Sequence, residues 1–184
     1  CRKPDARALI YSNWTPAIVS ELADYVEGAP FYLCYDWGFT DPTHIAFLQY
    51  RDGVFYQFDE MSGNNRGERE WIEDVVRRIL ALPDYDGPTF DEWAEVWKRR
   101  KPWPNPWPSV WPQQTAGDPS AVQMRFELKE HGFGTRAPAL VKHQVIQGQD
   151  VMRAAIHAGS GHRRYVVHPR CRVTIRAFEN YRAR

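Results

Sequence analysis

The clearest hydrophobic pattern of the chain begins at residues 31–35, a continuous apolar and aromatic run that ends at Asp36. A short run of this kind, followed by a turn residue such as Gly38, predicts a buried central strand. Residues 43–50 and 54–58 are two further strand-like segments, and the Asp-Gly pair between them favours a tight hairpin. The pattern therefore predicts three antiparallel strands in succession.

Helical periodicity follows these strands. Between residues 68 and 82, apolar side chains recur at the spacing of one buried helix face, and Pro83 ends the run. Residues 89–100 predict a second, shorter helix. Residues 102–112 then alternate proline with tryptophan, a composition that resists regular structure and predicts an extended loop.

The last third of the chain alternates helices with strands. Asp118 is a favourable N-cap residue and Pro119 stands at the first helical position, so a helix is predicted from here to about residue 130. The elements after it are predicted as a strand, a helix, a strand and a helix at residues 139–145, 149–158, 164–168 and 169–182. The whole pattern predicts an α/β fold with a mixed central sheet, three antiparallel strands and then parallel strands, flanked by helices.

Residues 1–30 differ from the rest. They are largely polar, with one short helical pattern at residues 16–26 and a break at 28–30, which indicates a linker or leading arm. Residues 31–184 are long enough to form one domain with a buried core. Because the chain begins at Cys1 and shows no secretory signal, we interpret it as part of a longer polypeptide.

Charge is distributed unevenly along the chain. Residues 121–184 hold 12 Lys and Arg against 4 Asp and Glu, whereas the net charge of the whole chain is only +1. A basic face of this kind suits a polyanion such as DNA, although a solvated arginine-rich surface is the simpler alternative. Lys142, Arg163 and Arg164 are the candidate DNA contacts.

The sequence argues against a membrane-spanning protein and against an oxidising compartment. No apolar run approaches the roughly 18 to 20 residues of a membrane-spanning helix, so no membrane partner is expected. The three cysteines show no CxxC spacing, and Cys34 lies in an apolar run that suggests a buried, reduced thiol. A reducing compartment is therefore favoured.

Asp36 and Asp118 are the leading catalytic and metal-binding candidates. The predicted order of elements resembles the ribonuclease H-like plan, in which the first strand and the strand after the first helix lie side by side and end together. Two carboxylates at those ends can hold two divalent cations about 4 Å apart for phosphodiester hydrolysis. Taken singly, Asp36 has a simpler reading as a turn residue and Asp118 as an N-cap.

Local motifs around both acids resemble the nuclease domain of tailed-bacteriophage large terminase subunits, the DNA-packaging motors. Residues 35–42, with the letters YDWGFTDP, resemble that family's first-acid motif, and residues 117–121, GDPSA, resemble its second. Residues 55–60 look like its third strand ending in glutamate. Later landmarks are matched by Lys142 and by residues 148–156, 167–171 and 180–181.

This resemblance implies an endonuclease that uses two Mg²⁺ or Mn²⁺ ions to cut concatemeric viral double-stranded DNA during genome packaging. It implies partners as well: an ATPase domain on the same polypeptide, a small terminase subunit and the capsid portal. The place of action would be the cytoplasm of the infected bacterial host, transiently at the procapsid portal. No GxxxxGK[ST] loop occurs in the chain, so no ATP site is expected here.

Two departures from the family pattern leave alternatives open. The family's third metal-binding acid follows the equivalent of Tyr181, but this chain ends at Arg184, and Glu179 is a weak substitute. The proline-tryptophan insertion also obscures the strand before Asp118. The alternatives are a Holliday-junction resolvase or transposase-like nuclease, or a catalytically silent module that docks on DNA or the portal.

Several other residues could take part in the chemistry. Glu60 could reach the metals, although a solvent-facing glutamate at a strand end is more common. His157, His162, His168 and Cys171 lie within a short span and could suggest a zinc site, but their spacing matches no standard motif. The tryptophans at 103, 107 and 111 could stack on bases, but packing of an irregular loop is their more common use.

Overall fold

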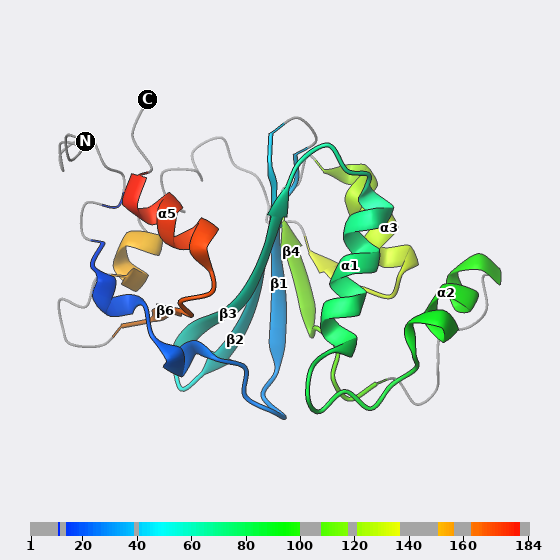
Figure 1. Cartoon of the computed structure of the whole chain (residues 1–184), viewed down its shortest axis with the longest axis horizontal. Coiled ribbons are helices and arrows are strands. Elements are labelled where there is room, and N and C mark those ends of the chain that lie inside the picture. Colours follow the sequence, from blue (N-terminus) through cyan, green and yellow to red (C-terminus); the bar gives the residue numbers. More distant parts are fainter. Residues whose placement is uncertain are drawn as a thin grey trace. The chain divides into compact units, whose positions relative to one another are not determined.

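A central mixed sheet organises the molecule. The computed structural model describes Tyr11 and residues 14–38, 41–99, 108–117, 121–136, 151–156 and 163–180. Six strands pair in the order β5-β4-β1-β2-β3-β6 (Figure 1). Their bounds are β1 Phe31–Asp36, β2 Thr43–Arg51, β3 Val54–Gly63, β4 Gln114–Gly117, β5 Thr135–Arg136 and β6 Tyr165–Val167.

The pairing combines antiparallel and parallel strands. β1, β2 and β3 are antiparallel, as the hairpin pattern predicted. β4 is parallel to β1, β5 is parallel to β4, and β6 is parallel to β3. The predicted mixed α/β class is therefore confirmed.

Helices lie between the later strands and after the last one. Four α-helices have the bounds α1 Glu68–Leu80, α2 Phe90–Arg99, α3 Val122–Glu130 and α5 Arg172–Asn180. Residues 151–156 are also helical. Two short 3-10 turns, η2 Pro16–Ile18 and η3 Glu21–Ala23, stand where one helical pattern was predicted over residues 16–26.

Some predicted details are wrong. The helix predicted from Asp118 begins at Val122 with Ala121 at its N-cap, so Asp118 is not the N-cap residue. Cys34 was predicted to be buried, but it is exposed to solvent on the side of β1 opposite Leu33 and Tyr35. The strand predicted at residues 139–145 lies outside the described residues, as does most of the proline-tryptophan loop.

The chain forms two compact units. One unit comprises residues 26–45 and 61–138, and the other comprises residues 1–25, 46–60 and 139–184. In the first unit, α1 buries the apolar face that its periodicity predicts, and α1 and α3 lie side by side (Figure 1). The buried α1 residues are Trp71, Ile72, Val75, Val76 and Ile79.

An aromatic stack extends the core of this unit. The Trp93 and Trp111 rings stack at 4.9 Å between centroids, and Trp111 stacks on Phe133 at the same distance. Trp93 Nε1 donates to the Tyr85 hydroxyl and Trp111 Nε1 donates to the Gly132 carbonyl, so the indole donors of both residues are satisfied. The stack therefore joins α2 to the segment that leads into β4.

The other unit has its own core. Phe58 packs against Phe47 and Tyr25, and Phe178 of α5 packs against Trp14 and Tyr165. Val19 makes a parallel bridge with Val167, so the η2–η3 segment lies along β6. In the part of the chain that the structure describes, no helix combines the length and apolar character needed to cross a membrane.

Candidate functional site

Asp36 is the last residue of β1 and its side chain is exposed. Strand alternation explains this, because Phe31, Leu33 and Tyr35 point into the core while the intervening residues face the other way. Cys34, two residues before Asp36 on that second face, is exposed as well. The carboxylate of Asp36 is therefore open to a ligand or a substrate.

The contact between β1 and β4 brings the two acid motifs to neighbouring positions. Tyr35 pairs in register with Gly117, and these two residues directly precede Asp36 and Asp118 in the sequence. A Cβ atom at Gly117 would lie 2.3 Å from Cε2 of the Tyr35 ring. The Tyr35 ring thus lies over the bare backbone of β4. Asp118 itself lies outside the described residues.

The turn after Asp36 is closely packed. The Gly38 amide donates to Thr43 Oγ1 at 3.2 Å, and Thr43 Oγ1 donates to the Gly38 carbonyl at 2.6 Å. A Cβ atom at Gly38 would come within 2.4 Å of the Asp41 carbonyl oxygen, so glycine is required there. Ser62 Oγ of β3 donates to the Thr43 carbonyl at 2.9 Å. These contacts fix the backbone that leaves Asp36.

Comparison with known proteins gives structural matches only. No protein-family model and no curated protein sequence matches the chain. The large terminase of a thermophilic bacteriophage, in complex with ADP, superposes with a TM-score of 0.69 at 16% identity, covering 95% of this chain and 37% of that one. The P22 large terminase nuclease domain superposes with a TM-score of 0.61 at 12% identity, covering 95% and 79%.

A third match agrees with these two. The large terminase nuclease of thermophilic phage G20c with bound cobalt gives a TM-score of 0.53 at 12% identity, covering 97% of this chain and 82% of that one. The chain has the fold of large-terminase nuclease domains. The resemblance seen in the sequence motifs and the predicted ribonuclease H-like fold class are thus confirmed as a likeness of fold. The chain spans about 37% of the length of the ADP-bound large terminase.

In this terminase-nuclease fold, Glu60 has a structural role that the sequence did not reveal. Its carboxylate accepts hydrogen bonds from the Val173 amide at 2.6 Å, the Thr174 amide at 3.0 Å and Thr174 Oγ1 at 2.8 Å. Amide groups at a helix N-terminus have no partner within the helix, and an acceptor carboxylate satisfies them. Glu60 therefore caps α5.

Cys171 and His168, two of the candidate zinc ligands, form other contacts. Cys171 is fully buried and its thiol donates to the Gln57 carbonyl at 3.7 Å. Burial, and then the negative charges of Glu60 and Asp59, raise the pKa of the Cys171 thiol to about 12. The thiolate that would bind a metal is thus strongly disfavoured near neutral pH.

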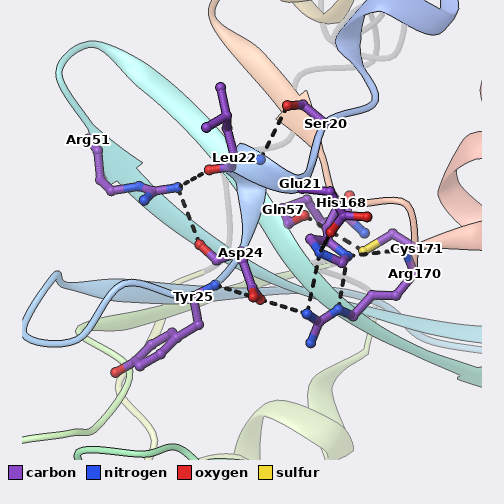
Figure 2. A network of polar contacts seen from close by, with 10 residues as sticks. All are labelled: Ser20, Glu21, Leu22, Asp24, Tyr25, Arg51, Gln57, His168, Arg170 and Cys171. Atoms are coloured by element: carbon purple, nitrogen blue, oxygen red, sulfur yellow. Dashed lines mark hydrogen bonds and ion pairs between the residues drawn. The ribbon is translucent and has the colours of Figure 1, made fainter.

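His168 belongs to a polar network around η3 (Figure 2). Its Nδ1 accepts from the Arg170 amide and from Arg170 Nε, so Nε2 carries the proton that it donates to Glu21 Oε2 at 2.7 Å. Arg170 also contacts Asp24 at 2.6 Å. Among the described residues no cluster of three metal-binding side chains occurs, and His157 and His162 lie outside them.

The basic candidates have different surroundings. Arg163 donates through its guanidinium to the Ala17 carbonyl. Arg164 is exposed, and its backbone amide donates to the Ala155 carbonyl at 3.0 Å while its carbonyl accepts from Phe55. Lys142 lies outside the described residues. Arg163 is therefore used to hold the N-terminal segment, and Arg164 keeps its guanidinium at the surface.

Proposed function

We propose that the chain is a metal-dependent endonuclease module that cleaves concatemeric viral double-stranded DNA during genome packaging, by two-metal phosphodiester hydrolysis. One observation carries the proposal. The fold is shared with large-terminase nuclease domains, and in it Tyr35 of β1 pairs with Gly117 of β4. The residues that follow these two in the sequence are Asp36, whose side chain is exposed, and Asp118. Asp36 is thus the last residue of β1, and Asp118 follows in the sequence directly after Gly117, the last residue of the adjacent parallel strand β4.

Asp36 and Asp118 are the proposed ligands of two divalent cations, Mg²⁺ or Mn²⁺. Carboxylate oxygens are the donors that these hard cations prefer, and the exposed Asp36 carboxylate fits that chemistry. The cobalt-bound G20c nuclease supports the use of a divalent metal by this fold. When bound, the cations would supply positive charge for the attacking and leaving oxygens of an in-line displacement.

The chain's own residues would orient the reacting groups. The Tyr35–Gly117 contact and the Gly38–Thr43 turn hold the backbone on both sides of Asp36, and this backbone carries the carboxylate. Ordering a ligand in advance reduces the cost of assembling a site. Lys142, Arg163 and Arg164 are the proposed contacts to the duplex backbone, where positive charge gives affinity without sequence preference.

The biological setting follows the same resemblance. The proposed partners are an ATPase domain of the same polypeptide, a small terminase subunit and the capsid portal, and the proposed place of action is the cytoplasm of an infected bacterium. The match covers only 37% of the ADP-bound large terminase, which supports an additional domain on the same polypeptide. Substrate choice would then come from the assembly instead of from base recognition.

The test is conversion of supercoiled plasmid to nicked and linear DNA with Mg²⁺, Mn²⁺ or EDTA. Cutting should need the metal and should fall at least a hundredfold in Asp36→Asn and in Asp118→Asn, because each removes a ligand charge. Asp91→Asn, a matched change at an exposed residue of α2, should cut like the wild type. Cutting that survives in Asp36→Asn would refute the assignment, and preference for branched DNA would favour a resolvase.

A further inference from the structure

The outer face of α5 carries an unneutralised basic stripe. Residues 163–180 hold five arginines against one glutamate. Arg172 and Arg176 lie four residues apart on α5 and both are exposed. Side chains at this spacing are neighbours on one side of a helix.

The buried side of α5 fixes which way these arginines face. Cys171, Thr174 and Phe178 are buried, and Thr174 Oγ1 accepts from Gln57 at 2.8 Å while Phe178 stacks on Trp14. Successive residues of a helix turn by roughly 100°, so Arg172 and Arg176 point away from that buried side. The packing of α5 against its own unit therefore presents both guanidinium groups to solvent.

Glu179 is the one carboxylate of α5 and is exposed three residues after Arg176, but it forms no ion pair with either arginine. Within the described residues, no carboxylate forms an ion pair with Arg172 or Arg176. The exposed basic residues at the end of α2 differ, because Lys98 lies 3.8 Å and Arg99 2.7 Å from Glu95. The guanidinium groups of Arg172 and Arg176 are thus available to an external anion, whereas Lys98 and Arg99 of α2 share the Glu95 carboxylate.

The N-terminus of α5 cannot take that anion. Glu60 already occupies the amides of Val173 and Thr174. An anion bound at α5 must therefore lie along the side of the helix, across Arg172 and Arg176. This arrangement fits a polymer with repeated negative charges better than a single small anion.

We propose that the outer face of α5, through Arg172 and Arg176, is a binding surface for the phosphate backbone of double-stranded DNA. The inference rests on the proposed function, because it assumes a duplex substrate, but it assigns a surface that takes no part in the metal chemistry. Arginine suits this role, since its planar guanidinium donates two hydrogen bonds to phosphate. Such contacts set the register of the duplex without reading its sequence.

The test measures binding of a short fluorescent DNA duplex in EDTA, where no cutting occurs, over a series of NaCl concentrations. The variant Arg172→Gln/Arg176→Gln should bind more weakly at every salt concentration. The slope of log affinity against log salt should become shallower by about 2, because about one counterion is released per phosphate contact. The control Lys98→Gln/Arg99→Gln removes the same charge from α2 and should bind like the wild type.

Three results would overturn the proposal: no duplex binding by the wild type, unchanged binding by the α5 variant, or an equal loss in both variants. Circular dichroism and melting temperature would show that both variants fold. Because the assay needs no metal, its outcome is independent of the plasmid-cutting test. If the wild type cuts DNA but the Arg172→Gln/Arg176→Gln variant binds the duplex as tightly as the wild type, only the proposed DNA-binding surface is wrong. If that variant binds more weakly but the wild type does not cut DNA, only the proposed nuclease activity is wrong.

Discussion

At the scale of single residues, the contact between Gly117 and Tyr35 is the most constrained feature of the candidate site. The Tyr35 side chain is only 6% exposed, so its ring has little freedom to move away from β4. Any side chain at position 117 must displace that ring or separate the two strands. The glycine is therefore a packing requirement, set by the residue next to it in the register.

Gly117→Ala should destabilise the protein by about 1–3 kcal/mol, the usual range for overpacking a well-packed site. Alanine in place of glycine otherwise favours a strand, so a loss of stability identifies the clash as the dominant effect. Urea or thermal unfolding measures this change. Because the shift occurs directly before Asp118, plasmid cutting should fall as well.

Gly134→Ala is the matched control for this prediction. Gly134 precedes β5 in the same unit, and no atom lies within 4 Å of the position that a Cβ would take there. The free energy of unfolding of the Gly134→Ala variant should differ from that of the wild type by no more than about 0.5 kcal/mol. If both variants were equally stable, the close approach of Tyr35 to β4 would be wrong.

At the scale of elements, the sequence predicted those with a long periodic signal. The apolar alternation of β1 to β3 and the buried face of α1 each extend over enough residues to specify their period. β4 and β5 were not predicted, because strands of four and two residues carry too little pattern. The arrangement that matters most for the site, a strand beside β1 that ends before Asp118, was expected only from the ribonuclease H-like plan, and the structure provides the strand itself and its register, Tyr35 opposite Gly117.

The candidate site was predictable to a similar extent. Asp36 could be chosen because it ends a strong strand and begins a recognisable motif. The cap that Glu60 forms on α5 could not be predicted, since Glu60 and Thr174 are 114 positions apart and no local pattern links them. The Arg170–Asp24 ion pair, 146 positions apart, was missed for the same reason.

Glu60→Ala should destabilise the protein by about 1–3 kcal/mol, because it leaves two amides at the start of α5 without their acceptor. Unfolding by urea measures this cost. The control Glu130→Ala, at an exposed residue near the end of α3, should be nearly neutral. Below the melting temperature of the variant, plasmid cutting per folded molecule should stay at the wild-type level.

That last measurement separates two roles of the same carboxylate. If Glu60 bound a catalytic metal, its removal would abolish cutting even where the protein remains folded. If it only caps α5, cutting would decline only as the folded population declines. The three hydrogen bonds that Glu60 accepts from Val173 and Thr174 support the second outcome.

At the scale of the whole molecule, the charges of the chain serve different purposes in different segments. The acidic first two thirds carry the candidate metal ligand Asp36, and the basic last third carries the unneutralised stripe on α5. A protein that binds metal and DNA needs both signs of charge, because cations need carboxylates and phosphates need arginines. The near-zero net charge of +1 therefore results from two large opposing contributions.

Divalent metal should raise the stability of the whole protein. A ligand that binds only the folded state adds about 2.7 kcal/mol at a concentration one hundred times its dissociation constant. For a chain of this size, each kcal/mol raises the melting temperature by roughly 2–4 °C, so saturating Mn²⁺ should raise it by roughly 5–10 °C. Thermal unfolding with Mn²⁺ or with EDTA measures the shift without any cutting.

Asp36→Asn should lose most of that shift, since it removes one of the proposed ligands. In EDTA the same variant should be about as stable as the wild type, because Asp36 is exposed and exposed substitutions usually change the free energy of unfolding by no more than about 0.5 kcal/mol. Asp91→Asn controls for loose binding at another acidic surface, where Asp91 lines an open hollow with Glu92 and Glu95. An equal Mn²⁺ shift in the wild type and in Asp36→Asn would place the metal elsewhere. A shift lost only in Asp91→Asn would place it on α2, and Asp36 would then have to be explained as a turn residue.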